Sequence, residues 1–261
     1  MAYIKLKPDR TFFVRKQTVE IGMAVLLLIS VYALSGKTAR MTANAKTAET
    51  IVVIDAGHGG ADPGKVASDG CKEKDINLAV ARKVQGKLEK AGIEVVMTRE
   101  NDEMLHDAGN DGEKVRDMQL RCEKINTSQA VCAVSIHQNS FQSSSVRGAQ
   151  VFYYTGSEQG QQFAQIMQQQ LVEILDPSNT RVCKENSSYY LLKKTSVPLV
   201  IVECGFLSNP EEAAMLQTEE FQDRTADAIC MGIQKYLETC SDQTGSPEIS
   251  GKAEQRVLEK Y

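Results

Sequence analysis

Residues 51–60 read IVVIDAGHGG, an unbroken β-branched run followed by a glycine-rich turn that carries a histidine. Runs of Val and Ile of this kind are typical of a strand buried on both faces of a parallel sheet. The turn begins at the carboxyl end of that strand, where the side chains that form the site of an open α/β sheet converge. We therefore expect His58 to lie at the site edge of a parallel sheet.

Strands and helices alternate along the rest of the domain. Helices are predicted over 75–91, 115–127, 158–175 and 218–238, and strands over 93–97, 131–136, 149–154 and 199–202. Residues 102–114 are acidic and contain glycine, and they predict a loop. This alternation indicates an α/β fold, a three-layer sandwich in which helices flank a mostly parallel, mixed central sheet.

The composition excludes several classes of protein. There are 30 Lys and Arg against 34 Asp and Glu, a net charge of -4, which argues against a partner that is a nucleic acid. The seven cysteines include no CxxC pair, which argues against a disulfide scaffold or a cysteine-based zinc site. Cys132, Cys204 and Cys230 fall in apolar runs and are expected to be buried thiols.

The first residues indicate export. Five basic residues precede an apolar run over residues 21–34, as in a secretory signal or a signal anchor: Lys5, Lys7, Arg10, Arg15 and Lys16. The excess of basic residues before the run predicts an extracytoplasmic domain, either membrane-anchored or secreted. We expect a basic segment with signal or anchor over 1–36, a linker over 37–49, the catalytic domain over 50–238 and a polar tail over 239–261.

Two of the three histidines follow predicted strands. His58 follows IVVIDAG, and His137 follows VCAVSI. Because carboxyl ends of parallel strands meet at one edge of a sheet, these two imidazoles can lie together. His106 lies in the predicted loop instead.

Two glutamates are the other candidate site residues. Glu203 ends the apolar run LVIVE, and a carboxylate there is costly unless it is paired or binds a cation. A salt bridge to Arg99 or Arg121 would explain Glu203 equally well. Glu73 lies at a predicted helix start, where acidic residues favour the helix dipole, and Asp75 fits the role of the helix cap.

Two histidines, one carboxylate and an open position make a catalytic zinc site. A zinc ion acidifies a water molecule and polarises a carbonyl, and a nearby glutamate can pass the proton to a leaving amine. These groups suit amide hydrolysis. The chain has no HExxH motif, so it is not a zincin.

Six motifs in order carry a family resemblance: VVIDAGHGGADPG, EKDINLAVARKV, VVMTRENDE, LRCEKIN, AVSIHQNS and VIVECGFLSNPEEA. Together they cover roughly residues 50–237 and resemble the zinc-dependent N-acetylmuramoyl-L-alanine amidases of peptidoglycan metabolism (the amidase type 3 family). Within that family the chain is most similar to the germination-specific amidases of spore-forming bacteria, which share the run GAQVFYY and a short anchored architecture.

The resemblance implies a role for each motif residue. His58, Glu73 and His137 match the ligands of Zn²⁺, and Glu203 matches the catalytic carboxylate. Arg99, Asn126 and Asn139 match further motif positions, whose role is either to shape the site or purely structural. His106 matches no motif and is expected on the surface of a loop.

The resemblance also implies a reaction and its setting. The reaction is hydrolysis of the amide between N-acetylmuramic acid and the L-alanine of the stem peptide. In the spore-type enzymes this is the first step towards muramic-δ-lactam in the cortex, which a muramic acid deacetylase completes. The alternatives are a zinc carboxypeptidase acting on the stem peptide, an amidase that needs an activating partner, or a non-catalytic, membrane-anchored wall-binding protein.

Overall fold

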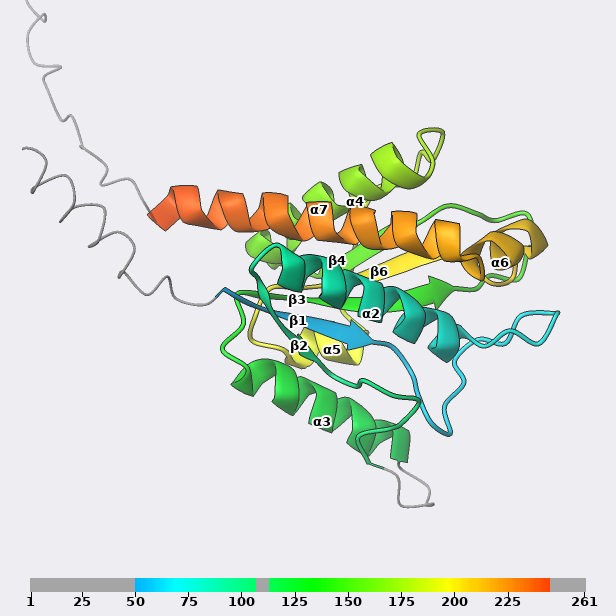
Figure 1. The fold of residues 1–261 in the computed structure, drawn as a ribbon, viewed down its shortest axis with the longest axis horizontal. Coiled ribbons are helices and arrows are strands. Elements are labelled where there is room, and N and C mark those ends of the chain that lie inside the picture. Colours follow the sequence, from blue (N-terminus) through cyan, green and yellow to red (C-terminus); the bar gives the residue numbers. More distant parts are fainter. Residues whose placement is uncertain (1–49, 107–112, 245–261) are drawn as a thin grey trace, which may run out of the picture. The chain divides into compact units, whose positions relative to one another are not determined.

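The computed structural model describes residues 50–106 and 113–244 (Figure 1). The predicted signal or anchor, the linker, the centre of the 102–114 loop and most of the polar tail lie outside the described residues. Among the helices of the described ranges, none has the length and hydropathy to cross a membrane. The compact unit that contains the sheet begins at Thr50.

Six strands form a single sheet in the order β2-β1-β3-β6-β4-β5. They span Ile51–Ala56 (β1), Glu94–Met97 (β2), Cys132–Asn139 (β3), Gln150–Tyr154 (β4), Lys184–Asn186 (β5) and Leu199–Phe206 (β6). Neighbouring strands are parallel throughout, except that β4 runs antiparallel to β6. The predicted mostly parallel, mixed sheet is confirmed. The sequence did not predict β5, because its three residues, KEN, are polar and largely exposed.

The helices are α2 (Glu73–Lys90), α3 (Glu113–Thr127), α4 (Glu158–Leu175), α5 (Tyr190–Lys194), α6 (Pro210–Leu216) and α7 (Glu219–Thr244). Figure 1 shows α2, α4 and α7 on one face of the sheet and α3 with α5 on the other, which completes three layers. Helix α7 continues beyond the predicted end at residue 238. The short helices α5 and α6 were not predicted.

The sheet buries a core on each face because successive residues of a strand point to opposite sides. Val52 and Ile54 of β1 belong to the cluster beneath α2, α4 and α7, together with Phe163. Val53, between them, packs with Ile125 on the α3 and α5 side. A run of four apolar residues therefore fills two cores, which explains why β1 shows no alternation of polar and apolar residues.

Strand order places the functional residues. The motif strands β1, β3 and β6 are adjacent and parallel, so their carboxyl ends lie side by side. Helix α2 starts at the same edge with Glu73 as its first residue. The predicted capping of α2 by Asp75 is wrong: Lys72 is the N-cap residue, and its side chain makes no capping hydrogen bond. Both acidic residues instead lie in the first turn, where they favour the helix dipole.

Candidate metal centre and active site

His58 is presented by an unusual backbone conformation just past β1. Its φ is 61°, in the left-handed region that residues other than glycine rarely adopt. Its Nδ1 lies 2.8 Å from Asp62 Oδ2, which fixes the ring and leaves Nε2 facing Glu73. Burial alone would lower the pKa of His58, but hydrogen bonds and charges from Asp62 and Glu73 raise it to about 9. Asp62 was not predicted as a site residue.

His137 lies within β3 rather than after it, because the strand continues to Asn139. Its ring meets that of His58 edge-on, with centroids 5.0 Å apart. The ring lies over Gly57: a Cβ added to that glycine would be 2.3 Å from His137 Cε1. The motif GHGG therefore needs glycine at position 57 to leave room for the second imidazole.

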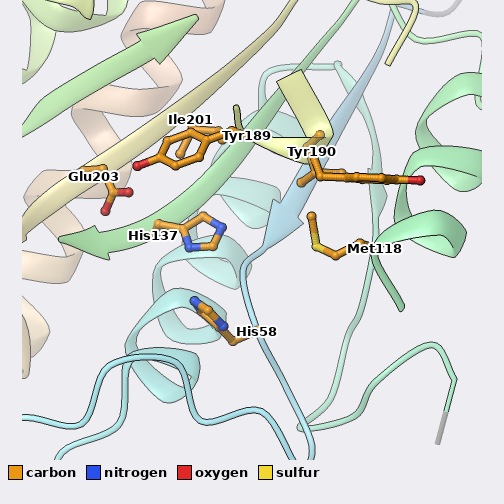
Figure 2. A pocket seen from close by; sticks show the side chains of 8 residues that line it. His58, Met118, His137, Tyr189, Tyr190, Ile201 and Glu203 are labelled. Atoms are coloured by element: carbon orange, nitrogen blue, oxygen red, sulfur yellow. The ribbon is translucent and has the colours of Figure 1, made fainter. Parts of the chain in front are cut away.

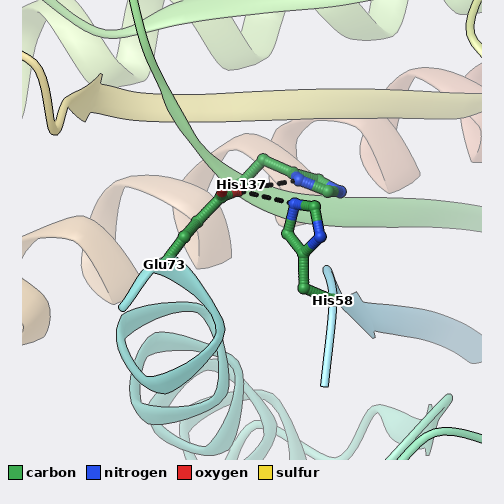
Figure 3. A group of neighbouring side chains, drawn as sticks. All are labelled: His58, Glu73 and His137. Carbon is green, nitrogen blue, oxygen red and sulfur yellow. Dashed lines mark hydrogen bonds and ion pairs between the residues drawn. The ribbon is translucent and has the colours of Figure 1, made fainter. Parts of the chain in front are cut away.

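Glu73 joins the two histidines (Figure 3). Its Oε1 lies 3.2 Å from His58 Nε2 and 3.0 Å from His137 Nδ1. The backbone N–H of Gln138 also donates to Oε1, and that of Lys65 donates to Oε2. Burial would raise the pKa of this carboxyl group, but the two imidazoles and their hydrogen bonds hold it well below its usual range. Glu73 is thus a buried carboxylate rather than an exposed dipole residue.

These three side chains fit a metal ion. One donor atom from each of His58, Glu73 and His137 lies within 4.8 Å of the others. Zinc–ligand bonds of about 2.0–2.2 Å place neighbouring ligands of a tetrahedron roughly 3.3 Å apart, close to the imidazole–carboxylate distances found here. Two histidines and one carboxylate are also the donor set of known catalytic zinc sites, which keep a fourth position open. The sequence predicted this convergence, and the structure brings the three residues together.

Glu203 lies beside this cluster on β6, directly opposite His137 in the strand register. Its Oε2 is buried and accepts no hydrogen bond from the described residues. Burial raises the pKa of Glu203 to about 7, with a smaller opposing effect from His137. The salt bridge to Arg99 or Arg121 that the sequence left open is absent from the described residues, because both arginines bind elsewhere.

Those arginines support the backbone below the site. Arg121 donates to Asp55, to Asp117 and to the carbonyl oxygen of His58. Arg99 donates to the carbonyl oxygens of Ala56, Gly57 and Lys74. The two guanidinium groups therefore fix the turn that carries His58.

The amide side chains at the other motif positions have local partners. Asn126 joins α3 to the segment after α5, donating to Lys194 O and accepting from Ser196 N. Asn139 accepts a hydrogen bond from the N–H of Ser140. His106 is an exposed loop residue, as predicted.

A cavity of about 250 Å³ adjoins the three candidate residues His58, His137 and Glu203. Its other lining residues come from α3, β6 and the α5 region: Met118, Ile201, Tyr189, Tyr190 and Leu191. In Figure 2 the ring of Tyr189 points its hydroxyl towards Glu203. Burial and the nearby Glu203 carboxylate raise the pKa of Tyr189. Tyr189 and Tyr190 were not predicted as lining residues of this cavity, although the aromatic pair in SSYYLL, next to polar turn residues, was a usable signal.

Comparisons with known proteins give matches over most of this chain. The model of a family described as N-acetylmuramoyl-L-alanine amidase matches residues 52–235. The germination-specific N-acetylmuramoyl-L-alanine amidase of Bacillus subtilis (strain 168) is 35% identical over 220 residues, covering 83% of this chain and 92% of the relative.

Solved structures show the same fold. The CwlD amidase from Clostridioides difficile, solved in complex with the GerS lipoprotein, is 39% identical, with a TM-score of 0.71, covering 73% of this chain and 99% of that one. The amidase AmiC2 of Nostoc punctiforme is 32% identical, with a TM-score of 0.64, covering 73% of this chain and 98% of that one.

Proposed function

The chain belongs to the N-acetylmuramoyl-L-alanine amidase family and is a peptidoglycan amidase, and we propose that it is a zinc enzyme with Glu203 as its catalytic carboxylate. The observation that carries this proposal is the convergence of donor atoms from His58, Glu73 and His137 on one point. Glu203 lies opposite His137 and faces the same cavity with a carboxylate oxygen that has no hydrogen-bond partner among the described residues.

The arrangement assigns a task to each side chain. A bound zinc ion would supply acidification of water and polarisation of the amide carbonyl. Asp62 holds the ring of His58 so that Nε2 faces Glu73, in the way that carboxylates orient metal-binding histidines. Glu203 takes the proton of the attacking water and passes it to the amine of L-alanine as that group leaves. Its pKa of about 7 suits a group that acts first as base and then as acid.

Zinc titration and muropeptide cleavage test this proposal. The purified chain should bind about one zinc ion, release stem peptides and stop when zinc is chelated. Glu203→Gln should keep the ion and lose about 10²–10⁴-fold in rate. Glu123→Gln is the matched control, because Glu123 is exposed on α3 and should leave the rate unchanged. A Glu203→Gln protein that cleaves at the wild-type rate would show that the assigned role is wrong.

The products separate an amidase from the carboxypeptidase alternative. Cleavage at the muramoyl amide leaves a muramic acid that carries no peptide, whereas a carboxypeptidase shortens the stem and leaves its first residue attached. Mass spectrometry of digested sacculi distinguishes the two. The non-catalytic alternative is not supported, because the chain belongs to an enzyme family and retains all four predicted site residues.

We further propose that the substrate is the peptidoglycan of the spore cortex. Support comes from the germination-specific relative, which matches 83% of this chain. In this role the amidase prepares muramic acid for δ-lactam formation, in functional coupling with a muramic acid deacetylase.

The proposed location is outside the cytoplasmic membrane, with the domain either anchored or secreted. The support is the basic segment and apolar run of residues 1–36, followed by the linker over 37–49 and a catalytic domain over 50–238.

A further inference from the structure

A second cavity shares no lining residue with the cavity of the candidate active site and has no part in the proposed mechanism. It opens at the start of β4 and has a volume of about 380 Å³. Two arginines, Arg147 and Arg181, line it together with the polar side chains of Ser178, Asn179 and Thr180 and one carboxylate, Asp176. A polar cavity with two guanidinium groups is suited to binding an anion.

The strand register connects this cavity to the catalytic carboxylate. Gln150 of β4 is the antiparallel partner of Glu203. Side chains directly opposite each other lie on the same face of the sheet, with Cβ atoms about 4.5–5.5 Å apart. Gln150 Oε1 in turn accepts a hydrogen bond of 3.2 Å from Arg181 Nη1. Glu203, Gln150 and Arg181 therefore form a row that leads from the proposed catalytic carboxylate across the sheet.

Arg181 is held in place by three contacts. Its Nε donates to the carbonyl oxygen of Arg147 at 2.7 Å, and Nη1 bonds Gln150. The guanidinium lies over the ring of Phe206, 4.7 Å from its centroid. Phe206 ends β6, the strand that also carries Glu203. The Nη2 donors make no hydrogen bond with the described residues. The guanidinium group is therefore held in place while its Nη2 atom can still donate to a ligand.

The charge of Arg181 is also uncompensated within the described residues, because no carboxylate there forms an ion pair with it. Arg147 differs. Its Nη1 lies 3.6 Å from Glu211 Oε2, and its charge, after the hydrogen bonds from Ser178, helps to lower the pKa of Asp176. Arg181 is thus the stronger anion-binding group, and Arg147 is an auxiliary one.

We propose that Arg181, assisted by Arg147, binds a carboxylate of the stem peptide and so determines which stem peptides the enzyme accepts. This inference rests on the amidase function. The lactyl carboxyl group of muramic acid is consumed in the scissile amide, so the free carboxylates of the substrate lie on its peptide side. Gln150 and Glu203 lie one strand spacing apart, about 4.7–4.9 Å, and an extended peptide advances about 3.3–3.6 Å per residue. We therefore assign to Arg181 the carboxylate of the residue that follows L-alanine. The peptide then crosses β6 towards β4, and the glycan lies on the His58 side.

A pair of substrates that differ only in this carboxylate tests the proposal. Both are N-acetylmuramoyl-L-alanyl-D-glutamyl compounds whose γ-carboxyl group is blocked as a methylamide. One keeps the α-carboxylate of D-glutamate free, and the other carries an α-carboxamide in its place. The wild type should prefer the acid by about tenfold to a hundredfold, mainly in KM, as expected for a charge-assisted hydrogen bond. Arg181→Gln should remove this preference by weakening cleavage of the acid alone. Arg181→Lys should retain part of it, and Arg147→Gln should reduce it less.

The control is Arg82→Gln, which removes an exposed arginine of α2 that donates to the carbonyl oxygen of Glu100 and does not line this cavity. It should keep the wild-type preference. Equal cleavage of the two substrates by the wild type would overturn the proposal, as would an equal loss on both in Arg181→Gln. If the wild type cleaves neither substrate, the amidase function fails, and calorimetric titration with both compounds still decides the anion site. Tighter binding of the acid that is lost in Arg181→Gln supports the site, and equal affinities refute it.

Discussion

At the residue scale, Asp62 supports the proposed metal site without being one of its proposed ligands. It holds His58 Nδ1 at 2.8 Å while the backbone at His58 is in the left-handed region. Asp62→Ala frees the ring to rotate, so we expect zinc affinity to fall about 10–100-fold. Competition with a chromogenic chelator measures this change.

Lys114 provides a matched control for Asp62. Its Nζ lies 2.7 Å from Asp62 Oδ1, on the side of the carboxylate away from His58, and its side chain is exposed. Lys114→Ala removes this ion pair but leaves the bond to His58, so zinc affinity should change little. If the two variants bind zinc equally well, Asp62 does not position His58.

Asp55 contributes to the dependence of protein stability on pH in the acidic range. Burial would raise the pKa of this carboxyl group, but the charge of Arg121 and hydrogen bonds from Ser135 and Thr98 lower it to about 2. A group whose pKa is lower in the folded state contributes stability above its unfolded pKa of about 4, and loses it as the pH falls through 2. The shift corresponds to about 2 kcal/mol of free energy of unfolding.

Urea denaturation at several pH values isolates this contribution. Asp55→Asn leaves the buried Arg121 with Asp117 as its remaining acidic partner, and we expect a loss of about 3–5 kcal/mol near neutral pH. The variant should also lose less stability than the wild type between pH 4 and pH 2. Ser135→Ala, which removes one hydrogen bond to Asp55, is the milder variant and should flatten the same pH dependence partly. A pH dependence identical to the wild type in both would exclude Asp55 as its source.

At the scale of elements, the junction between β1 and the following turn requires a residue without a side chain, Gly57. A Cβ at Gly57 would lie 2.3–2.7 Å from three atoms of the His137 ring. Gly57→Ala must therefore displace that imidazole, and we expect zinc binding and cleavage to fall together while the sheet still folds. Metal content and rate, measured beside a circular-dichroism spectrum, check this expectation.

Gly86 offers the comparison within α2. A Cβ added there meets nothing within 4 Å, and alanine is preferred to glycine inside a helix. Gly86→Ala should bind zinc normally and raise the free energy of unfolding by about 0.5–1 kcal/mol. Normal zinc binding in Gly57→Ala would show that His137 can move without losing its role.

Elements with a strong apolar pattern could be predicted from the sequence, and short polar ones could not. The core of β1 was recognisable because its run of Val and Ile is buried on both faces. By contrast, β5 has three polar residues at the edge of the sheet, and its place there depends on pairing with β4. The start of α6 did carry a local signal, since Asn209 caps it and Pro210 follows.

Some residues of the candidate site could be predicted from the sequence, and others could not. His58 and His137 follow from their positions at the ends of adjacent parallel strands. Glu73 was assigned as a ligand only through the family resemblance. Its residue type and position alone also fit an ordinary acidic residue at a helix start, because only the tertiary structure brings it between the two imidazoles. Asp62 was missed because a loop contact of this kind leaves no periodic pattern in the sequence, whereas the aromatic pair that contains Tyr189 did carry a local signal.

At the scale of the whole molecule, the two faces of the sheet differ in what they carry. The face with α2, α4 and α7 carries the larger core, whereas the cavity of the active site opens on the side of α3 and α5. The strand register pairs Glu203, the proposed catalytic carboxylate, with Gln150, and Gln150 in turn accepts a hydrogen bond from Arg181. Catalysis and the proposed recognition of the peptide therefore share one edge of the sheet.

The proposed role in the spore cortex predicts a change in the muropeptide composition of spores. Without the amidase, stem peptides remain on muramic acid, and the lactyl carboxyl group needed for the δ-lactam ring is never freed. Muropeptide analysis of spores that lack this chain should show muramic-δ-lactam lost and stem-substituted muramic acid increased. Re-expression of the wild type should restore the lactam. Glu203→Gln should not, because that variant keeps the proposed metal ligands but lacks the proposed base. Normal lactam content in spores without the chain would instead place its amidase activity in another part of the wall.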